Sequence, residues 1–226
     1  METAAPSSAP PAPRRRILLH ACCGPCSTHC VRELRAADVE PVLFYSNSNI
    51  DTEEEFEKRL AALRAFAAAE GVEVLADAYD PASWERAVAG FEAEPEGGAR
   101  CDRCFRHNLG RAAAKAAELG FEAFSTTLTV SPHKSSPRVF AAGRAAAAET
   151  PGAPPFLEED FKKKDGFLDS VRLAKAYGLY RQDYCGCRFS RAARDARAAL
   201  RERGDSCIIR PRTCASSTDT SSRTSS

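Results

Sequence analysis

The residues of this chain most able to do chemistry are its cysteines, which number ten in 226 residues. A thiolate can act as a nucleophile, a redox group or a ligand for zinc and iron. Seven of the ten fall in three short motifs: Cys22-Cys23-Gly24-Pro25-Cys26, Cys101-Asp-Arg-Cys104 and Cys185-Gly186-Cys187. We interpret Cys30, one helical turn after Cys26, as a core residue instead. The seven cysteines of the three motifs predict a metal, cluster or thiol redox centre.

The spacing within each motif limits its chemistry. Neighbouring cysteines rarely bond to each other, because an eight-membered ring strains the peptide between them, so Cys22 and Cys23 suggest ligands of a shared polynuclear centre. Two intervening residues let Cys101 and Cys104 converge on one metal or cluster, and a helix N-terminus there would favour thiolate. A spacer without a side chain lets the sulfurs of the third motif approach each other. Structural zinc is the competing interpretation, but adjacent thiolates are awkward in a zinc knuckle, so the pattern favours an iron–sulfur cluster.

Short apolar runs alternate with helical stretches and must position these motifs. We expect strands at 17–20, 41–45, 72–75 and 123–126, with a fifth at 156–157, and helices at 26–37, 52–69, 82–90, 103–119, 136–149, 167–177 and 190–203. Alternation of this kind predicts a single α/β, Rossmann-like domain over 14–204, with a mostly parallel sheet and helices on both faces. The first cysteine motif directly follows the first strand, where open α/β sheets bind ligands. Segments 1–13 and 205–226, which are rich in Pro, Ala, Ser and Thr, are expected to be disordered tails.

Composition excludes several classes of protein. With 43% hydrophobic and 28% charged residues, the chain is typical of a globular protein and not of a disordered one. No apolar run approaches the roughly 18 residues of a membrane span, and the N-terminus does not match a signal peptide, so we expect a cytoplasmic protein without membrane partners. Residues 161–203 carry twelve basic and five acidic side chains. This basic segment could meet an anionic partner.

Longer motifs occur around these cysteines in a fixed order along the chain. They are LLHACCGPCS at 18–27, NSNI at 47–50, YDP at 79–81, EPEGGARCDRCF at 94–105, STTLTVSP at 125–132, DFKKKDGFLDS at 160–170 and GLYRQDYCGCRFS at 178–190. Together they resemble the QueH-type epoxyqueuosine reductase family, over about residues 17–190.

The resemblance implies an activity and a set of cofactors. Members of the family reduce the epoxide of epoxyqueuosine, at the wobble position of certain transfer RNAs, to queuosine in the last step of its synthesis. They are similar in carrying a 4Fe–4S cluster, in some cases with a nearby non-cluster iron. Carried over by motif, the cluster ligands would be Cys22, Cys23, Cys101 and Cys104. Some members have Asp and others Cys at the position of Cys26, which would make it a ligand of the second metal.

The sequence leaves two roles open for the C-G-C pair and several candidates for the proton donor. Reduction of an epoxide to an alkene takes two electrons and two protons and releases water. Cys185 and Cys187 are expected to be catalytic, either as a two-electron redox dithiol able to form a disulfide or as ligands of a second iron. Asp80, His133 and Tyr184 are candidates for the proton donor, although Asp80 before Pro81 could equally be a helix N-cap. His20 is expected to orient the cysteines without binding metal.

Transfer RNA and an unidentified electron donor are the expected partners. Basic residues and interleaved aromatic residues of the C-terminal part could contact phosphates and stack on a base: Lys162, Lys163, Lys164, Arg181, Arg188 and Arg191, with Phe161, Phe167, Tyr177, Tyr180 and Tyr184. Phe167 and Tyr177 could instead belong to the core. Two rival functions are an adenylating or sulfur-inserting transfer-RNA enzyme and a zinc- or cluster-binding module. The first lacks support, because Cys-Cys-Gly-Pro-Cys replaces the glycine-rich phosphate loop.

Overall fold

The computed structural model describes residues 14–202, in which one parallel sheet is flanked by helices. The sheet has the order β3-β2-β1-β4, formed by β1 (Arg15–His20), β2 (Val39–Tyr45), β3 (Val74–Ala76) and β4 (Phe124–Thr126). All three strand pairs are parallel. The two tails predicted from composition, and Cys207 and Cys214, lie outside the described residues.

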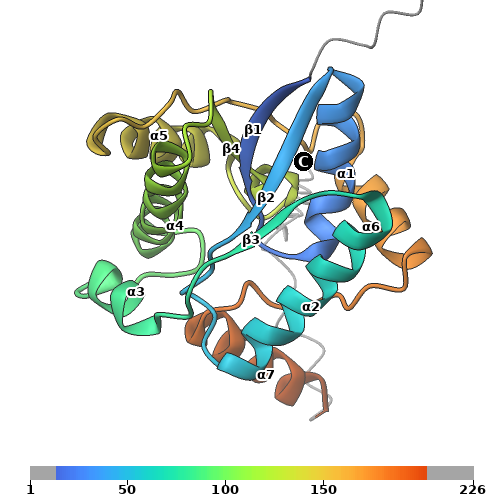
Figure 1. The fold of residues 1–226 in the computed structure, drawn as a ribbon. Coiled ribbons are helices and arrows are strands. Elements are labelled where there is room, and N and C mark those ends of the chain that lie inside the picture. The colour runs from blue at the N-terminus through green and yellow to red at the C-terminus, as the bar shows by residue number, and fades with distance from the viewer. Residues whose placement is uncertain (1–13, 203–226) are drawn as a thin grey trace, which may run out of the picture.

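Helices cover both faces of the sheet (Figure 1). Along β1, Ile17 and Leu19 pack on one side and Leu18 on the other, as the two-residue period of a strand requires. The first face is covered by α1 (Gly24–Ala36), α2 (Glu53–Glu70) and α6 (Gly166–Ala176), and the second by α4 (Ala99–Glu118) and α5 (Ser136–Glu149). The predicted α/β class is therefore confirmed.

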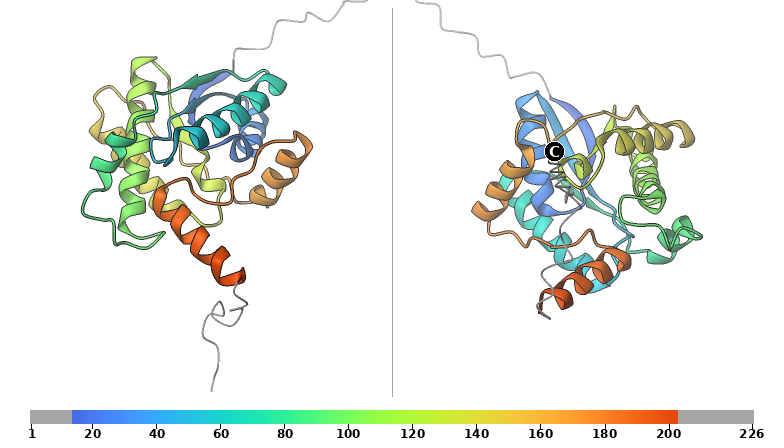
Figure 2. Two further views of the ribbon diagram at one scale, coloured as in Figure 1. Left: turned by 90° about the horizontal axis from the view of Figure 1, so that it is seen from below. Right: turned by 180° about the vertical axis from the view of Figure 1, so that it is seen from behind.

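The remaining helices lie at the edges of these layers. They are α3 (Pro81–Val88), the 3₁₀ helix η1 (Thr127–Val130) directly after β4, and α7 (Arg188–Glu202). Figure 2 shows α7 extending away from the body of the domain. No helix within 14–202 combines the length and apolar character needed to cross a bilayer.

Several predicted elements differ from the structure. The third strand is Val74–Ala76 and not 72–75, because Gly71, with φ of +63°, ends α2 and the chain needs two residues to reach the sheet. Phe156 makes only an isolated bridge to Phe124, so the fifth strand does not form. Helices α1 and α4 begin at Gly24 and Ala99, before the predicted 26 and 103. The earlier start of α4 brings Cys101 into the first turn of the helix.

The strand order places a ligand-binding crevice beside β1. The chain moves from β1 to β2 and β3 on one side and returns to β4 on the other, so neighbouring connections diverge at the carboxyl ends of β1 and β4. There His20, fully buried, bonds through Nδ1 to Thr126 Oγ1 at 2.9 Å and through Nε2 to the carbonyl oxygen of Ser46 at 3.0 Å. The ring thus ties together the ends of β1, β2 and β4.

Candidate functional site

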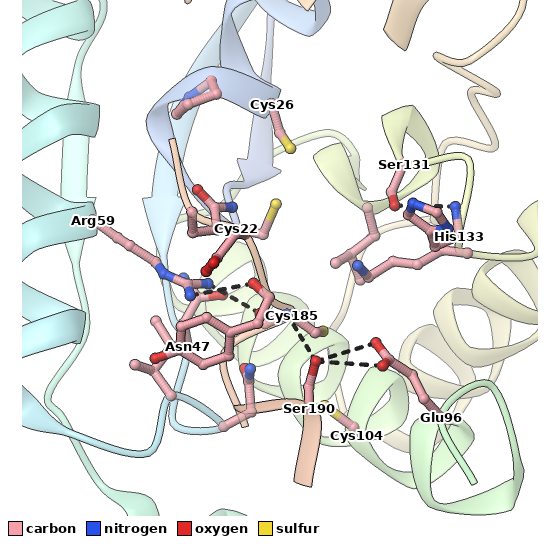
Figure 3. A pocket seen from close by; sticks show the side chains of 18 of the residues that line it. Cys22, Cys26, Asn47, Arg59, Glu96, Cys104, Ser131, His133, Cys185 and Ser190 are labelled. Carbon is pink, nitrogen blue, oxygen red and sulfur yellow. Dashed lines mark hydrogen bonds between the residues drawn. The ribbon is translucent and has the colours of Figure 1, made fainter. Parts of the chain in front are cut away.

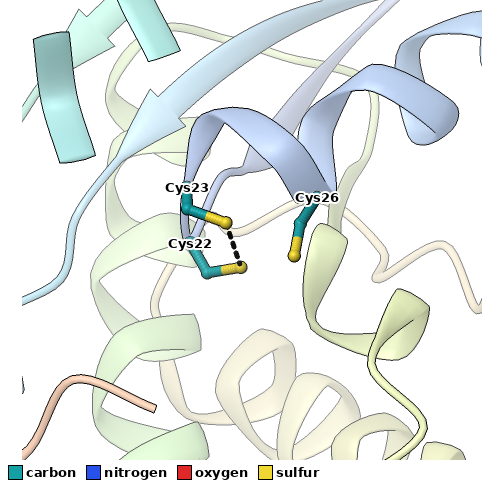
Figure 4. Close-up of side chains that lie close together, drawn as sticks. All are labelled: Cys22, Cys23 and Cys26. Atoms are coloured by element: carbon teal, nitrogen blue, oxygen red, sulfur yellow. Dashed lines mark hydrogen bonds between the residues drawn. The ribbon is translucent and has the colours of Figure 1, made fainter. Parts of the chain in front are cut away.

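Three cysteine side chains converge where β1 passes into α1. The sulfur atoms of Cys22, Cys23 and Cys26 all lie within 4.8 Å of one another. Figure 4 shows all three sulfurs at the start of α1, with 3.9 Å between those of Cys22 and Cys23. Three convergent thiols at a helix N-terminus suit a metal or a cluster, since the helix dipole favours negative charge there. Among residues 14–202 no other such group of three metal-binding side chains is found.

Local packing holds this turn in place. A Cβ atom on Gly24 would come within 2.8 Å of the carbonyl oxygen of Ala62 in α2, so only glycine permits the close approach of α1 to α2. Thr127 of η1 bonds twice to Cys22: its Oγ1 accepts from the backbone N–H at 3.1 Å and donates to the sulfur at 3.3 Å. Asn47 donates to the carbonyl oxygen of Ala21 at 2.9 Å. The loop is therefore held from α2, β2 and β4.

The thiols of this trio differ in pKa. Hydrogen bonds from Cys22 and then Cys26 hold the pKa of Cys23 well below its usual value, whereas hydrogen bonding with Cys22 and then Cys23 raises the pKa of Cys26 well above its usual value. Of the three thiols, that of Cys23, the N-cap residue of α1, therefore loses its proton most readily. A polarised trio of this kind is prepared to bind a cation.

A cavity of about 570 Å³ opens beside the trio, and cysteines from three distant segments line it (Figure 3). Those segments contribute Cys22 and Cys26, then Cys104, then Cys185. Residues that follow β2 and β4, among them Asn47 and Leu128, complete the wall. The tertiary structure therefore brings members of all three predicted motifs to one cavity.

Cys101 and Cys104 lie inside α4 and not ahead of it. The backbone N–H of Gly97 donates to the sulfur of Cys101 at 3.2 Å, and Asn108 Nδ2 donates to the sulfur of Cys104 at 3.8 Å. Burial raises the pKa of both thiols, which is opposite to the lowering expected from a helix N-terminus. Desolvation outweighs the helix dipole here, so a bound cation would be needed to favour the thiolates.

The C-G-C turn is anchored through its backbone. Its bonds are Arg59 Nη1 to the carbonyl oxygen of Cys185 at 3.0 Å, the N–H of Asp51 to the carbonyl oxygen of Gly186 at 3.0 Å, and the N–H of Cys185 to Ser190 Oγ at 3.0 Å. Gly186 has φ of +129°, which side chains disfavour. Burial raises the pKa of Cys187 to about 11. These three bonds therefore fix the backbone of Cys185 and Gly186.

The structure places the three proton-donor candidates differently. His133 and Tyr184 line the cavity. Asp80 does not line it: its Oδ1 accepts from the N–H of Ser83 at 3.1 Å as the N-cap of α3. The capping alternative therefore accounts for Asp80, because the packing of α3 holds it outside the cavity. His20 uses both ring nitrogens in hydrogen bonds, which fits the orienting role predicted for it.

Several predicted RNA-binding residues already have protein partners. Arg188 pairs with Glu85, and Arg191 Nε lies 2.7 Å from Asp51 Oδ2. Lys162 Nζ donates to the carbonyl oxygen of Lys134 at 2.5 Å, whereas Lys163 and Lys164 are exposed. Arg181 lies over the ring of Phe167, 5.2 Å from its centroid. Of the aromatic residues, Phe161 is buried in the core, and Tyr177 and Tyr180 bond to Glu70 and Glu55.

Sequence reasoning missed residues that support the cysteines. They are Arg59, Thr127, Asn108, Lys134 and Glu96, of which Arg59, Asn108, Lys134 and Glu96 line the cavity. Negative charge at Cys185 raises the pKa of Lys134, so this ammonium group stays charged beside the thiols. Figure 3 shows Ser190 between Cys185 and Glu96. Thr127 and Glu96 lie within motifs that carried the resemblance, which was the available signal.

Comparison with known proteins agrees with the resemblance found in the sequence. The sequence model of the family described as "Epoxyqueuosine reductase QueH" matches residues 17–193. Curated proteins called "Epoxyqueuosine reductase QueH" are similar to the chain. The protein from Streptococcus pyogenes serotype M1 is 39% identical over 181 residues, covering 77% of this chain and 69% of the relative. Those from Thermotoga maritima and Acinetobacter baylyi are 35% and 32% identical, covering 77% of this chain in each case and 89% and 80% of the relatives.

Proposed function

This chain belongs to the epoxyqueuosine reductase QueH family, and we propose that it reduces the epoxide of epoxyqueuosine in transfer RNA to the cyclopentene of queuosine. The observation that carries the proposal is the cavity lined by cysteines from three separate motifs. It lies at the switch point of the sheet, where α/β proteins bind substrates. Its volume of about 570 Å³ is in the range of small-molecule sites.

The chemistry of the donor set fits an iron–sulfur cluster. We propose that Cys22, Cys23, Cys101 and Cys104 hold a 4Fe–4S cluster and that Cys26 is a ligand of an adjacent second iron. The close approach of Cys26 to Cys22 and Cys23 supports its role as a metal ligand. When bound, such a cluster supplies electrons one at a time.

The overall reaction needs two electrons and two protons, and the epoxide oxygen leaves as water. We propose that Cys185 and Cys187 act as a two-electron dithiol, which gives up two electrons and two protons as it forms a disulfide and is reduced again by the external electron donor. Ligation of the second iron by the same pair is the alternative. The anchored backbone of the C-G-C turn supports either role, because it fixes Cys185, which lines the cavity, and Cys187 follows two residues later in the same turn.

Groups around the cavity can hold the substrate and move protons. The ammonium group of Lys134 can stabilise negative charge on the leaving oxygen. His133 and Tyr184 are the proton-donor candidates that line the cavity, and we propose that protons reach the oxygen from this wall. Asp80 acts from outside the cavity as the cap of α3, so any effect of Asp80 on the reaction would be indirect.

The substrate enters as part of an RNA, which we propose meets the basic C-terminal segment. An external electron donor must also reach the cavity. The cytoplasm, where transfer RNA is modified, is the proposed location.

One experiment tests the function. The anaerobically reconstituted protein is incubated with transfer RNA containing epoxyqueuosine and dithionite, and the RNA is then digested to nucleosides. Conversion of epoxyqueuosine to queuosine supports the proposal. An unchanged nucleoside profile with a fully loaded, folded protein contradicts it. Metal analysis of the same sample separates the rival binding module, for which zinc and no iron is expected.

A further inference from the structure

The arginines of α7 form a stripe that begins directly after the C-G-C turn. Arg188, Arg191, Arg194, Arg197 and Arg201 follow one another at intervals of three or four residues, so the stripe winds around the helix: Arg197 lies on the side opposite Arg188, and Arg201 lies on the side of Arg197. Because α7 begins directly after the C-G-C turn and extends away from the domain body (Figure 2), the helix leads outward from that turn. The helix is therefore a charged arm beside the proposed substrate site.

The stripe divides into a neutralised half and an unpaired half. Arg188 pairs with Glu85 and Arg191 with Asp51, and Arg194 Nη1 lies 2.7 Å from Asp183 Oδ1. These three pairs fasten the first turns of α7 to the domain. Arg197 and Arg201 make no ion pair with any residue that the structure describes. The charge available to a partner is thus in the distal half of the helix.

Two exposed arginines belong to both the cavity and the outer surface. Arg181, in the segment after α6, and Arg197, in α7, line the cavity and are exposed. Arg181 makes no ion pair within 14–202, and its guanidinium lies over Phe167, another lining residue. Of the two carboxylates in the lining, Asp183 is paired with Arg194, whereas Glu96 accepts only from the neutral hydroxyl of Ser190 and keeps its charge, so two guanidinium groups, those of Arg181 and Arg197, stand against one uncompensated carboxylate. The cavity therefore has thiols in its wall and guanidinium groups where it meets solvent.

We propose that Arg181 and Arg197 bind the phosphates on either side of the modified nucleotide, and that Arg201 binds a further phosphate of the same strand. This inference rests on the proposed function. A nucleotide that places its base in the cavity leaves two phosphates outside it. Guanidinium groups match phosphate in charge and in fork geometry. Arg201 lies about 6 Å further along the helix axis than Arg197, so the arm can follow the backbone as it leaves the site.

Salt-dependent RNA binding tests this assignment. The probe is the unmodified anticodon stem-loop of a substrate transfer RNA, labelled with a fluorophore and titrated with full-length protein at several salt concentrations. Each of Arg181→Ala, Arg197→Ala and Arg201→Ala should reduce the slope of log affinity against log salt by about 1, irrespective of loop sequence. The control is Arg144→Ala, since Arg144 is an exposed arginine of α5 that pairs with Glu158 and does not line the cavity. It should leave the slope unchanged.

Three results would overturn the proposal. The first is a wild-type protein that does not bind the stem-loop. The second is that Arg181→Ala, Arg197→Ala and Arg201→Ala, called the rim variants, keep the full salt slope. The third is an Arg144→Ala variant that loses as much slope as the rim variants do. Turnover with dithionite separates this inference from the function itself. If the wild type reduces epoxyqueuosine while the rim variants keep their slope, only the phosphate assignment is wrong. If those variants bind RNA normally but lose activity with a protein reductant alone, the arm docks an acidic electron donor instead.

Discussion

The guanidinium group of Arg59 in α2 donates a hydrogen bond of 3.0 Å to the carbonyl oxygen of Cys185, 126 residues further along the chain. Arg59 is only 2% exposed, and its Nε also lies 2.6 Å from Glu55 Oε1. A second bond, at 3.4 Å, reaches the carbonyl oxygen of Tyr184. One buried cation thus connects the helix after β2 to the turn that carries the C-G-C pair. It is a positioning residue, since it acts on the sulfurs through the backbone.

We expect Arg59→Met to destabilise the protein by about 3–5 kcal/mol, because it leaves two carbonyl groups and the partly buried carboxylate of Glu55 without the guanidinium group. Urea unfolding measures this loss. The rate at which Cys185 and Cys187 react with a thiol reagent should also rise as the turn loosens. Arg59→Lys keeps the charge but not the fork of donors, so it should recover part of the stability and less of the thiol protection.

The matched control is Arg35→Met. Arg35 also pairs with a glutamate, Glu40, and donates to a backbone carbonyl, that of Glu70, but it is partly exposed. Arg35→Met should lower the free energy of unfolding by about 1 kcal/mol or less and leave the reactivity of the C-G-C pair unchanged. Equal thiol reactivity in the Arg59 and Arg35 variants would contradict the positioning role.

Replacing Cys22, Cys23, Cys101 or Cys104 by Ala should abolish the iron–sulfur absorbance and the reduction of epoxyqueuosine. Cys26→Ala should lower the iron content without removing the cluster's absorbance. Cys30→Ala is the control, because Cys30 is fully buried in the apolar core. This variant should keep all the metal of the wild type. A variant of the first four that retained full iron and sulfide would exclude that residue as a ligand.

The two roles of the C-G-C pair predict different results for Cys185→Ser and Cys187→Ser. If the pair is a redox dithiol, the cluster spectrum should persist while multiple turnover stops, and the oxidised wild type should contain one disulfide at this pair. If the pair holds a second iron, the same variants should lose bound iron beyond that of the cluster. Thiol counting and metal analysis on both variants distinguish these outcomes. Full activity with full metal and no disulfide would eliminate both roles.

Two glycines should respond oppositely to the same substitution. Gly186→Ala places a Cβ 3.0 Å from Arg59 Nη1 at φ of +129°, so we expect a loss of about 1–3 kcal/mol and weaker activity. Gly110→Ala lies within α4, where a Cβ would meet nothing within 4 Å, and should stabilise by about 0.5–1 kcal/mol. Thermal unfolding of both variants checks the signs. A neutral Gly186→Ala would mean that the turn can relax.

Changing Lys162, Lys163 and Lys164 together to Ala should weaken transfer-RNA binding and reduce its salt slope. The expected reduction is about 2 and not 3, because Lys162 is already bonded to the carbonyl oxygen of Lys134. Titration of the same labelled stem-loop measures the slope. An unchanged slope would place the RNA surface away from this segment.

The local pattern of the sequence determined the elements and the chemistry. Apolar runs such as 17–20 predicted buried parallel strands, and the helix predicted at 52–69 agrees with α2 to within one residue at each end, because strand burial and helix formation depend on neighbouring residues. The motifs likewise indicated Cys22 and Cys23 as candidate metal ligands and Cys185 as a candidate catalytic residue, and they resembled the motifs of one family. Even the approach of Cys26 to Cys22 and Cys23 follows from one helical turn.

Only the tertiary structure decided which side chains meet. Asp80 carried the same carboxylate in either of its two predicted roles, and the packing of α3 made it a cap. Arg188 and Arg197 are alike in sequence, yet one faces Glu85 and the other lines the cavity. Arg59 gave no local sign of its bond to Cys185. Such pairings depend on how distant segments pack, and residue type fixes what a side chain can bind but not what lies within its reach.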